Sequence, residues 1–358
     1  MTQPNYPMIP TKCPYSFRQM DPDQQHSEFA PPGAELPAGW QNSGVITFAL
    51  AGARTSGKSI YIAMAIKLLE QLTINFGGTF DPADEFTENS FRENYEEPLF
   101  GSDESRPRVL SPTAPIDNPD AYQRRPLIYR LGRPKRFNQP NPQQIFVVFR
   151  DIAGEDLEAR DIRAKSEHLD FLQHADSVIY LYDPLAVPQI RSLVEGLVPT
   201  DSRSEASPAD VLKNVIEVLG PARPDISLTL AKFDILQEID RLETGGFAAT
   251  GSGSTSWPEV MNNLGAAFRR AGSGASRPFD TADSELVHEE TRSMLHSLGA
   301  QEMFNALEQP LGPPHNYHCH VVSSLGAPPS GDSISDYGIA PFRVLDPMRR
   351  VFNNYGLF

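Results

Sequence analysis

Short apolar runs recur along the chain, and segments with helical spacing follow most of them. The first run, residues 45–51, is nearly continuous in apolar and β-branched side chains, as in a strand buried on both faces. Periodicity alone does not separate such a run from a buried helix. Residues 60–72, however, carry apolar side chains at helical spacing, among them Ile62, Ile66 and Leu69. The pattern therefore predicts a strand, a short loop and a helix in that order.

The same alternation continues downstream. Further strands are expected at residues 126–131, 145–150, 177–182, 227–231 and 319–323. Helical patterns separate most of them, at residues 167–174, 209–219, 286–307 and 346–355. This order predicts a doubly wound α/β fold, with a mainly parallel sheet covered by helices on both faces. The second and third strands lack a helix between them, so we expect a hairpin that places one antiparallel strand on the edge.

Three stretches fall outside this alternation. Residues 1–42 are rich in Pro, Gln and Asp without periodicity, which is typical of a tail or linker. Residues 75–121 have no stable period, and residues 245–285 are rich in Gly, Ser, Ala and Thr over most of their length. We find no internal repeat. The chain is therefore expected to hold one domain, residues 43–358, with two long insertions.

Charge and composition narrow the partners. The net charge of −15 opposes a nonspecific grip on nucleic acid or anionic lipid, so a nucleic-acid partner is not expected. The basic clusters at Arg124-Arg125 and residues 133–136 fit either a local anion site or solvated loop ends. Two cysteines, Cys13 and Cys319, fit a reducing compartment, and neither a signal peptide nor a membrane-spanning run is visible. The composition thus indicates a soluble cytoplasmic protein.

The clearest chemical signal is a glycine-bounded loop between the first expected strand and helix. It has the complete P-loop pattern, Gly52-Ala53-Arg54-Thr55-Ser56-Gly57-Lys58-Ser59. Its glycines allow backbone N–H groups to point at phosphate oxygens, and the following helix N-terminus favours an anion. We expect residues 52–60, Ile60 included, to bind nucleotide phosphates, with Lys58 neutralising the β and γ phosphates. The Ser59 hydroxyl is expected to complete a Mg²⁺ shell.

A P-loop alone is compatible with ATPases, GTPases and nucleotide kinases, but three further signals follow it. Each one begins at or just after the end of an expected strand: Asp151-Ile152-Ala153-Gly154, Ala231-Lys232-Phe233-Asp234 and Ser323-Ser324-Leu325-Gly326. Such short patterns mean little singly. Their joint placement at the carboxyl ends of strands, where α/β sheets build ligand sites, favours a single nucleotide site.

With these motifs in this order, residues 43–358 resemble the Ras-like, translation-factor-related P-loop GTPase superfamily. The resemblance implies Mg²⁺ and GTP or GDP as ligands. It implies that Asp151 holds Mg²⁺ through water and that Gly154 senses the γ phosphate through its N–H at the hinge of a switch. By the same resemblance Asp234 reads the guanine edge and Lys232 packs along the base. Ser323, Ser324 and Leu325 would meet the guanine oxygen.

More narrowly, the chain resembles the bacterial double-GTPase families that are predicted to operate in multi-gene conflict or defence systems. The similar features lie at residues 50–59, 151–156, 231–234 and 287–290. The resemblance implies a GTP-dependent switch with a protein effector or regulator, and it leaves homo-oligomer formation open. A cysteine pair sometimes precedes the GTPase domain in such families. Here Cys13 stands alone, so a zinc site is not expected.

Several positions depart from the superfamily pattern. Ala231 replaces the usual Asn or Thr, so we expect a weaker preference for guanine. Glu155 stands where many members carry a water-positioning Gln, and it would either orient water or repel the nucleotide. Arg54 would either act in cis as an arginine finger or face outward. Lys58, Glu155 and Arg54 are the candidate catalytic residues.

The remaining candidates concern metals. Thr113 is the preferred switch threonine for Mg²⁺, with Thr79 and Thr87 as alternatives in the same expected insertion. His315, His318 and His320 surround Cys319, but strand alternation places His318 and His320 on one face and Cys319 on the other, which disfavours a metal site.

The sequence therefore favours a GTPase with slow intrinsic turnover. Two alternatives stay open, a guanine-nucleotide-binding scaffold that does not hydrolyse GTP and an ATPase or nucleotide kinase. Ala231 and the uncertain role of Glu155 favour the first alternative. The second would explain the P-loop without a role for Lys232 and Asp234.

Overall fold

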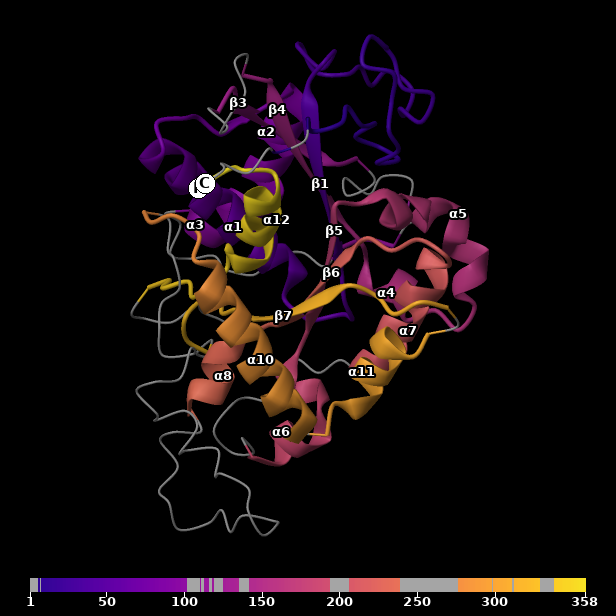
Figure 1. Ribbon diagram of the computed structural model, residues 1–358, viewed down its shortest axis with the longest axis vertical. Coiled ribbons are helices and arrows are strands. Elements are labelled where there is room, and N and C mark those ends of the chain that lie inside the picture. Colours follow the sequence, from indigo (N-terminus) through magenta and orange to yellow (C-terminus); the bar gives the residue numbers. More distant parts are fainter. Residues whose placement is uncertain are drawn as a thin grey trace.

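The computed structural model describes residues 6, 8–101, 110, 113–115, 118, 125–134, 142–193, 206–238, 276–297, 299–310, 312–328 and 338–358. Within these ranges, seven strands form one sheet in the order β2-β3-β4-β1-β5-β6-β7 (Figure 1). Their bounds are Gly44–Ala51 for β1, Asp81–Pro82 for β2, Leu127–Gly132 for β3, Ile145–Asp151 for β4, Ser177–Tyr182 for β5, Asp225–Leu230 for β6 and Tyr317–Val321 for β7.

Five adjacent strands of the sheet are mutually parallel: β4, β1, β5, β6 and β7. β3 pairs antiparallel with β4, which confirms the expected hairpin. The two-residue strand β2 pairs antiparallel with β3 on its other side, and the sequence pattern did not predict it. Because the five parallel strands point the same way, their carboxyl ends meet at one edge of the sheet, and every candidate motif lies on this edge.

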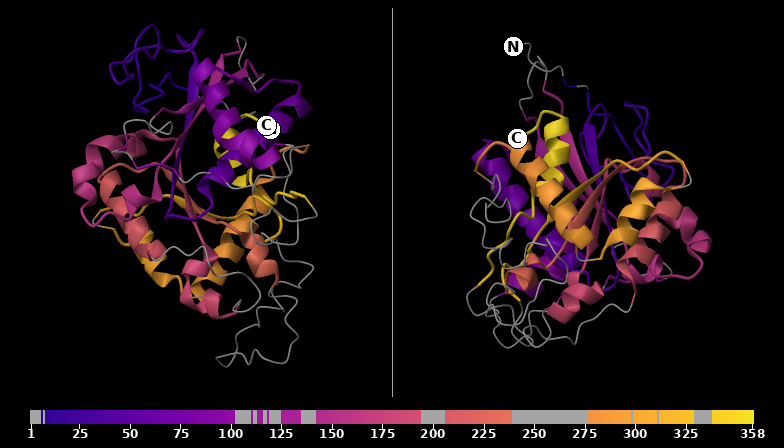
Figure 2. Two further views of the ribbon diagram at one scale, coloured as in Figure 1. Left: turned by 180° about the vertical axis from the view of Figure 1, so that it is seen from behind. Right: turned by 60° about the horizontal axis from the view of Figure 1, so that its bottom comes forward.

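One face of the sheet is covered by helices from both ends of the chain. These are α1 (Lys58–Asn75), α2 (Glu85–Phe91), α3 (Glu97–Phe100) and α12 (Asp346–Asn354) (Figures 1 and 2). Alternate residues of β1, including Ile46, Phe48 and Leu50, pack with α1 residues and with Phe352 of α12. Phe48 stacks on Phe149 of β4 with ring centroids 5.7 Å apart.

The opposite face carries a second helical layer and a second core. It contains α5 (Ser166–Leu169), α7 (Pro208–Leu219) and α11 (Gln301–Glu308) with adjoining 3-10 turns. Val45, Ala49 and Tyr180 of the sheet point into this core, together with Leu212 of α7 and Phe304 of α11. Helix α10 (Thr281–Ser297) lies against β7. The short helices α4 (Gly154–Leu157), α6 (Pro188–Leu193) and α8 (Phe233–Glu238) follow the carboxyl ends of β4, β5 and β6.

Two expected segments differ from the structure. The helix expected at residues 286–307 is two helices, α10 and α11, which are separated by a turn at Gly299 with φ 84°. The stretch at 75–121, which shows no stable period, contains β2, α2, a π-helical turn at Arg92–Glu96 and α3. Residues 245–275 of the other expected insertion lie outside the described residues, as do Arg124, Lys135 and Arg136.

The amino-terminal residues that composition assigns to a tail or linker pack on the domain from residue 8 onward. Trp40 is fully buried, and the centroid of its ring lies 4.7 Å from the ring centroid of Phe146 in β4. The Lys12 ammonium lies 2.8 Å from the Asp176 carboxylate, just before β5. This segment therefore forms part of the folded core in the structure.

Candidate functional site

The P-loop connects β1 to α1 with a backbone that only glycine fits at its first position. Gly52 has φ 147°, and a Cβ there would lie 2.1 Å from the carbonyl oxygen of Leu181 in β5. Gly57, with φ 90°, is the N-cap of α1 and has no side chain with which to occupy the first N–H groups of that helix. Such a helix N-terminus attracts anions through its N–H groups and its dipole. The loop thus has the geometry of a phosphate site.

Lys58 lies on the inner side of this loop. Its ammonium is buried and donates to the carbonyl oxygens of Gly52 at 2.8 Å and Ala53 at 2.9 Å. Burial lowers the pKa of Lys58, while the carboxylates of Asp151 and Glu158 act in the opposite direction. Other expected phosphate-binding positions lie beside it: Thr55 is exposed with φ 59°, Ser56 is buried, and Ser59 and Ile60 are half-buried in the first turn of α1.

Three oxygen side chains from separate segments meet next to Lys58. Thr113 donates its hydroxyl to Oδ2 of Asp151 at 2.8 Å, and the Ser59 hydroxyl lies 3.4 Å from that of Thr113. The structure thus brings Thr113, the preferred candidate for the switch threonine, into contact with both Asp151 and Ser59. The two alternatives lie elsewhere: Thr79 is exposed, and Thr87 accepts a hydrogen bond from the backbone N–H of Ile128 at 3.0 Å.

These oxygens fit a hard cation. Among the residues that the structure describes, Oδ1 of Asp151 is buried without a hydrogen-bond partner, which is costly unless a ligand satisfies it. Burial raises the pKa of Asp151 to about 6, against the opposing effects of Lys58 and of the Thr113 hydrogen bond. In the described part of the chain no three His, Cys, Asp or Glu side chains form a metal cluster. Two hydroxyls and one carboxylate are instead the sparse set that Mg²⁺ uses when water and phosphate complete its shell.

The candidate catalytic residues Arg54 and Glu155 are paired with each other. Nη2 of Arg54 lies 2.7 Å from Oε1 of Glu155, and both side chains are substantially exposed. A second carboxylate, that of Glu158, accepts a hydrogen bond from the backbone N–H of Arg54 at 2.7 Å. Gly154 is pressed against the same backbone, since a Cβ there would lie 2.2 Å from the Arg54 nitrogen. The sequence motifs did not include Glu158, and its only signal is its position one helical turn after Gly154.

The second motif cluster lies where β5, β6 and β7 end. The N–H of Ala231 donates to the Tyr182 carbonyl at 3.0 Å, so backbone contact joins the ends of β6 and β5 although the usual polar side chain is missing. Lys232 adopts φ 51° and places its ammonium 2.6 Å from Oδ2 of Asp183. The other carboxylate oxygen of Asp183 accepts from the N–H of Leu185 at 2.8 Å. Asp183 was missed from sequence, although an acidic residue directly after the strand at 177–182 was a usable signal.

The loop after β7 completes this cluster. Ser323 donates its hydroxyl to Oδ1 of Asp234 at 2.5 Å and accepts from the N–H of Gly326 at 2.7 Å. Ser323 also pairs with Phe342 in an isolated antiparallel bridge, and Ser324 and Leu325 follow it as half-buried residues. The structure thus brings together Lys232, Asp234 and the 323–326 loop, as the motif order predicts.

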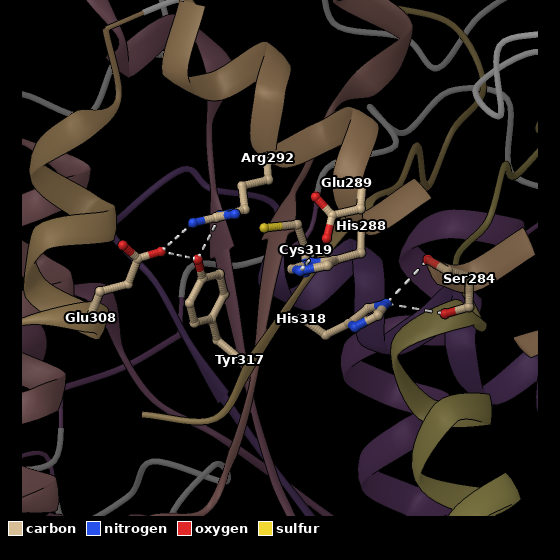
Figure 3. A network of polar contacts seen from close by, with 8 residues as sticks. All are labelled: Ser284, His288, Glu289, Arg292, Glu308, Tyr317, His318 and Cys319. Atoms are coloured by element: carbon tan, nitrogen blue, oxygen red, sulfur yellow. Dashed lines mark hydrogen bonds and ion pairs between the residues drawn. The ribbon is translucent and has the colours of Figure 1, made fainter. Parts of the chain in front are cut away.

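Two of the histidines around Cys319, His318 and His320, form a separate cluster with His288 of α10, and Figure 3 shows His318 and His288 between β7 and α10. His315, before β7, donates its backbone N–H to the Leu307 carbonyl at 2.9 Å. His318 stacks on His288 with ring centroids 4.4 Å apart and lies 4.9 Å from His320. The backbone N–H of Cys319 donates to Nδ1 of His288 at 2.9 Å. The buried Cys319 side chain belongs to the core that contains α7 and α11. Burial lowers the pKa of His318 to about 3, so the ring is neutral at physiological pH. The alternation predicted from sequence is confirmed, and the cluster is a packed, uncharged stack.

Comparison of the chain with known protein families gives a match over most of its length. The model of the Double-GTPase 2 family matches residues 46–297, which include the P-loop, Asp151, Gly154, Lys232 and Asp234. The chain belongs to the Double-GTPase 2 family. Among the described residues of this family member, no helix has both the length and the apolar character needed to cross a membrane.

The comparisons also give one curated relative and one solved structure. A protein of Mycolicibacterium smegmatis named SaeC, with a proposed role in ESX-1 scaffolding and assembly, is 36% identical over 323 residues, covering 90% of this chain and 78% of its own length. The Ski7 GTPase-like domain of S. cerevisiae, solved with GTP, covers 88% of this chain at 10% identity and a TM-score of 0.28. This chain spans 51% of that structure's chain.

Proposed function

We propose that this Double-GTPase 2 member binds GTP and GDP with Mg²⁺, hydrolyses GTP to GDP and phosphate, and acts as a nucleotide-dependent switch. The observation that carries the proposal is the contact series Ser59, Thr113, Asp151 beside the buried ammonium of Lys58. It joins a P-loop, a strand-end carboxylate and a segment between strands, which are the parts that phosphoryl-transfer sites combine.

Binding would divide between the two clusters. Residues 52–60 would hold the phosphates through backbone N–H groups and Lys58. Asp234 would accept hydrogen bonds from the guanine N1–H and exocyclic amine, a pair of donors that adenine does not present. Lys232 would pack along the base, and the loop at Ser323, Ser324 and Leu325 would meet the guanine oxygen. Its donors would be the N–H groups of Ser324 and Leu325, because that of Ser323 donates to the Phe342 carbonyl. The Ser323–Asp234 hydrogen bond supports this assignment because it fixes the carboxylate that reads the base.

Hydrolysis would proceed by in-line attack of water on the γ phosphorus. The new P–O bond forms to water, the bond to the β–γ bridging oxygen breaks, and the water proton ends on phosphate. Lys58 and the loop N–H groups would stabilise the charge that develops on the phosphate oxygens. Mg²⁺, held by Ser59, Thr113 and Asp151, would supply further charge neutralisation. Arg54 and Glu155 would contribute only after their mutual ion pair opens, which favours slow intrinsic turnover.

A nucleotide-dependent switch acts through a protein that distinguishes its nucleotide states, so we propose a protein effector or regulator as partner. The name of the SaeC relative, which refers to scaffolding and assembly, supports a protein partner. A cytoplasmic location, self-association and a role in a bacterial conflict or defence system belong to the same proposal. The Arg54–Glu155 pair also supports the second candidate, a guanine-nucleotide-bound scaffold that does not turn over, because it keeps both candidate catalytic side chains engaged.

Single-turnover phosphate release tests the proposal. Purified protein is mixed with equimolar GTP in Mg²⁺ or in EDTA, beside Ser59→Ala and a matched surface control, Ser297→Ala on α10. We expect Mg²⁺-dependent phosphate release that Ser59→Ala abolishes and Ser297→Ala preserves. Bound GTP that stays intact would favour the scaffold, and equal turnover of ATP would favour an ATPase.

A further inference from the structure

The carboxylate of Glu158 accepts a hydrogen bond from a backbone N–H group of the P-loop. Oε1 of Glu158 accepts the N–H of Arg54 at 2.7 Å, and Oε2 lies 3.7 Å from Nε of the Arg54 side chain. The Glu158 side chain is 20% exposed, compared with 56% for that of Arg54, so Glu158 is the more buried of the two side chains. Glu158 thus contacts the backbone of the loop, whereas Glu155 contacts the Arg54 side chain.

This contact lies next to the residue expected to sense the γ phosphate. Gly154 is so close to the loop that a Cβ on it would lie 2.2 Å from the Arg54 nitrogen. The N–H that Glu158 occupies is therefore adjacent to the Gly154 backbone, at the γ end of the proposed phosphate site. A carboxylate and a phosphate oxygen are both anionic acceptors and compete for one N–H donor. They also repel each other at short range.

Helix α4, whose C-cap residue is Glu158, is anchored independently of this contact. The buried carboxylate of Asp156 lies 2.5 Å from the Lys165 ammonium, and the Leu157 carbonyl accepts from Nδ2 of Asn214 on α7 at 2.7 Å. The Glu158 N–H closes the turn of α4 on the Gly154 carbonyl at 2.9 Å. The carboxylate can therefore leave the loop by rotation of its side chain while the backbone of α4 stays in place.

We propose that Glu158 is a specificity-determining acid that competes with the γ phosphate for the Arg54 N–H and so favours GDP over GTP. The inference rests on the proposed guanine-nucleotide site. Loading with GTP requires the Glu158 side chain to swing away from the loop, and its return after hydrolysis favours the diphosphate state. A partner that holds Glu158 away from the loop would promote GTP binding.

The test is the ratio of two affinities. Calorimetric titration gives the Kd of GDP and of a non-hydrolysable GTP analogue, both with Mg²⁺, for the full chain, Glu158→Gln and Glu158→Ala. Glu158→Gln keeps an acceptor but loses the charge, whereas Glu158→Ala loses both. Glu302→Gln, on the remote helix α11, is the matched control for loss of one negative charge.

We expect the preference for GDP over the analogue to fall about tenfold in Glu158→Ala and by a smaller factor in Glu158→Gln, with GDP affinity little changed. Glu302→Gln should keep the wild-type ratio. If every protein binds both nucleotides with an unchanged ratio, the competition is overturned and the guanine site stands. If none of them binds a guanine nucleotide, the proposed function fails and the competition fails with it.

Discussion

The Lys232 ammonium lies 2.6 Å from the Asp183 carboxylate, where β6 and β5 end side by side. The Asp183 side chain is 4% exposed and that of Lys232 27%, so the pair is largely shielded from water. Lys232 also holds a left-handed backbone conformation, with φ 51°. The ion pair therefore helps to fix a strained residue in the proposed base-binding loop.

Replacing Asp183 by Asn tests this role. The amide keeps the oxygen that caps the N–H of Leu185 but loses the charge that holds Lys232. We expect GDP affinity to fall about tenfold and the free energy of unfolding to fall by roughly 1–2 kcal/mol, as measured by titration and urea denaturation. Asp210→Asn, which removes an exposed partner of Lys213, is the control and should change neither quantity measurably. Wild-type GDP affinity in Asp183→Asn would contradict the assigned role.

Gly154→Ala tests the close packing of α4 on the P-loop. The added methyl group would lie 2.2 Å from the Arg54 nitrogen, so the loop or the helix must shift. We expect a loss of about 1–3 kcal/mol in unfolding free energy and a sharp loss of nucleotide affinity. At Gly78 a Cβ would make only an ordinary contact, 3.5 Å from the Thr73 carbonyl oxygen, so Gly78→Ala serves as the control. Equal effects of the two substitutions would rule out a special constraint at Gly154.

The pH dependence of Mg²⁺-assisted binding follows from Asp151. Burial raises the pKa of this carboxyl group to about 6, from an ordinary value of 3.8. A metal-binding carboxylate must be deprotonated, so Mg²⁺-dependent GDP affinity should be constant above about pH 7 and fall by up to tenfold per unit below about pH 6. Asp151→Asn should abolish this Mg²⁺-dependent component at every pH. A wild-type profile that is flat from pH 5 to pH 8 would show that Asp151 does not act in this way.

The histidine stack predicts an acid-sensitive fold. The pKa of His318 lies at about 3 in the folded chain, below its ordinary value of 6.5, because burial disfavours the imidazolium. The unfolded chain therefore binds the proton first, so the contribution of His318 to stability is complete above about pH 6.5 and is lost as the pH falls towards 3. Between these values the slope is up to about 1.4 kcal/mol per pH unit for one proton.

Denaturation curves at pH 7, 6 and 5 measure this slope. His318→Gln should lower stability at pH 7 and reduce its fall with acid, whereas His26→Gln at an exposed position should leave the wild-type slope. An unchanged slope in His318→Gln would assign the acid sensitivity to other groups.

Local patterns predicted the parts of the molecule that depend on local physics. The P-loop, the strands that end at Asp151 and before Lys232, and the hairpin of β3 and β4 follow from periodicity and glycine placement within short windows. Thr113 was chosen as a candidate because the superfamily order places a threonine before the second expected strand, residues 126–131.

The contacts that were missed depend on long-range packing. Asp183 meets Lys232 only because β5 lies beside β6, and Glu158 meets the Arg54 N–H only because α4 lies against the P-loop. The pattern of a single sequence does not show which of these elements are neighbours. The amino-terminal segment was assigned to a tail because it is rich in Pro, Gln and Asp without periodicity, and Trp40 packs through a long-range contact. Its burial against Phe146 arises from a partner about a hundred positions away in the sequence.

The most direct test of the guanine-nucleotide assignment is a competition titration. Fluorescent GDP is bound to the protein with Mg²⁺ and displaced by unlabelled GTP, GDP or ATP, in parallel for Lys58→Ala and Asp234→Ala. We predict that both guanine nucleotides displace the probe far better than ATP, that Lys58→Ala abolishes binding, and that Asp234→Ala loses the preference for guanine. Equal displacement by ATP, with no change in Asp234→Ala, would contradict the base-reading site and leave only a general P-loop protein.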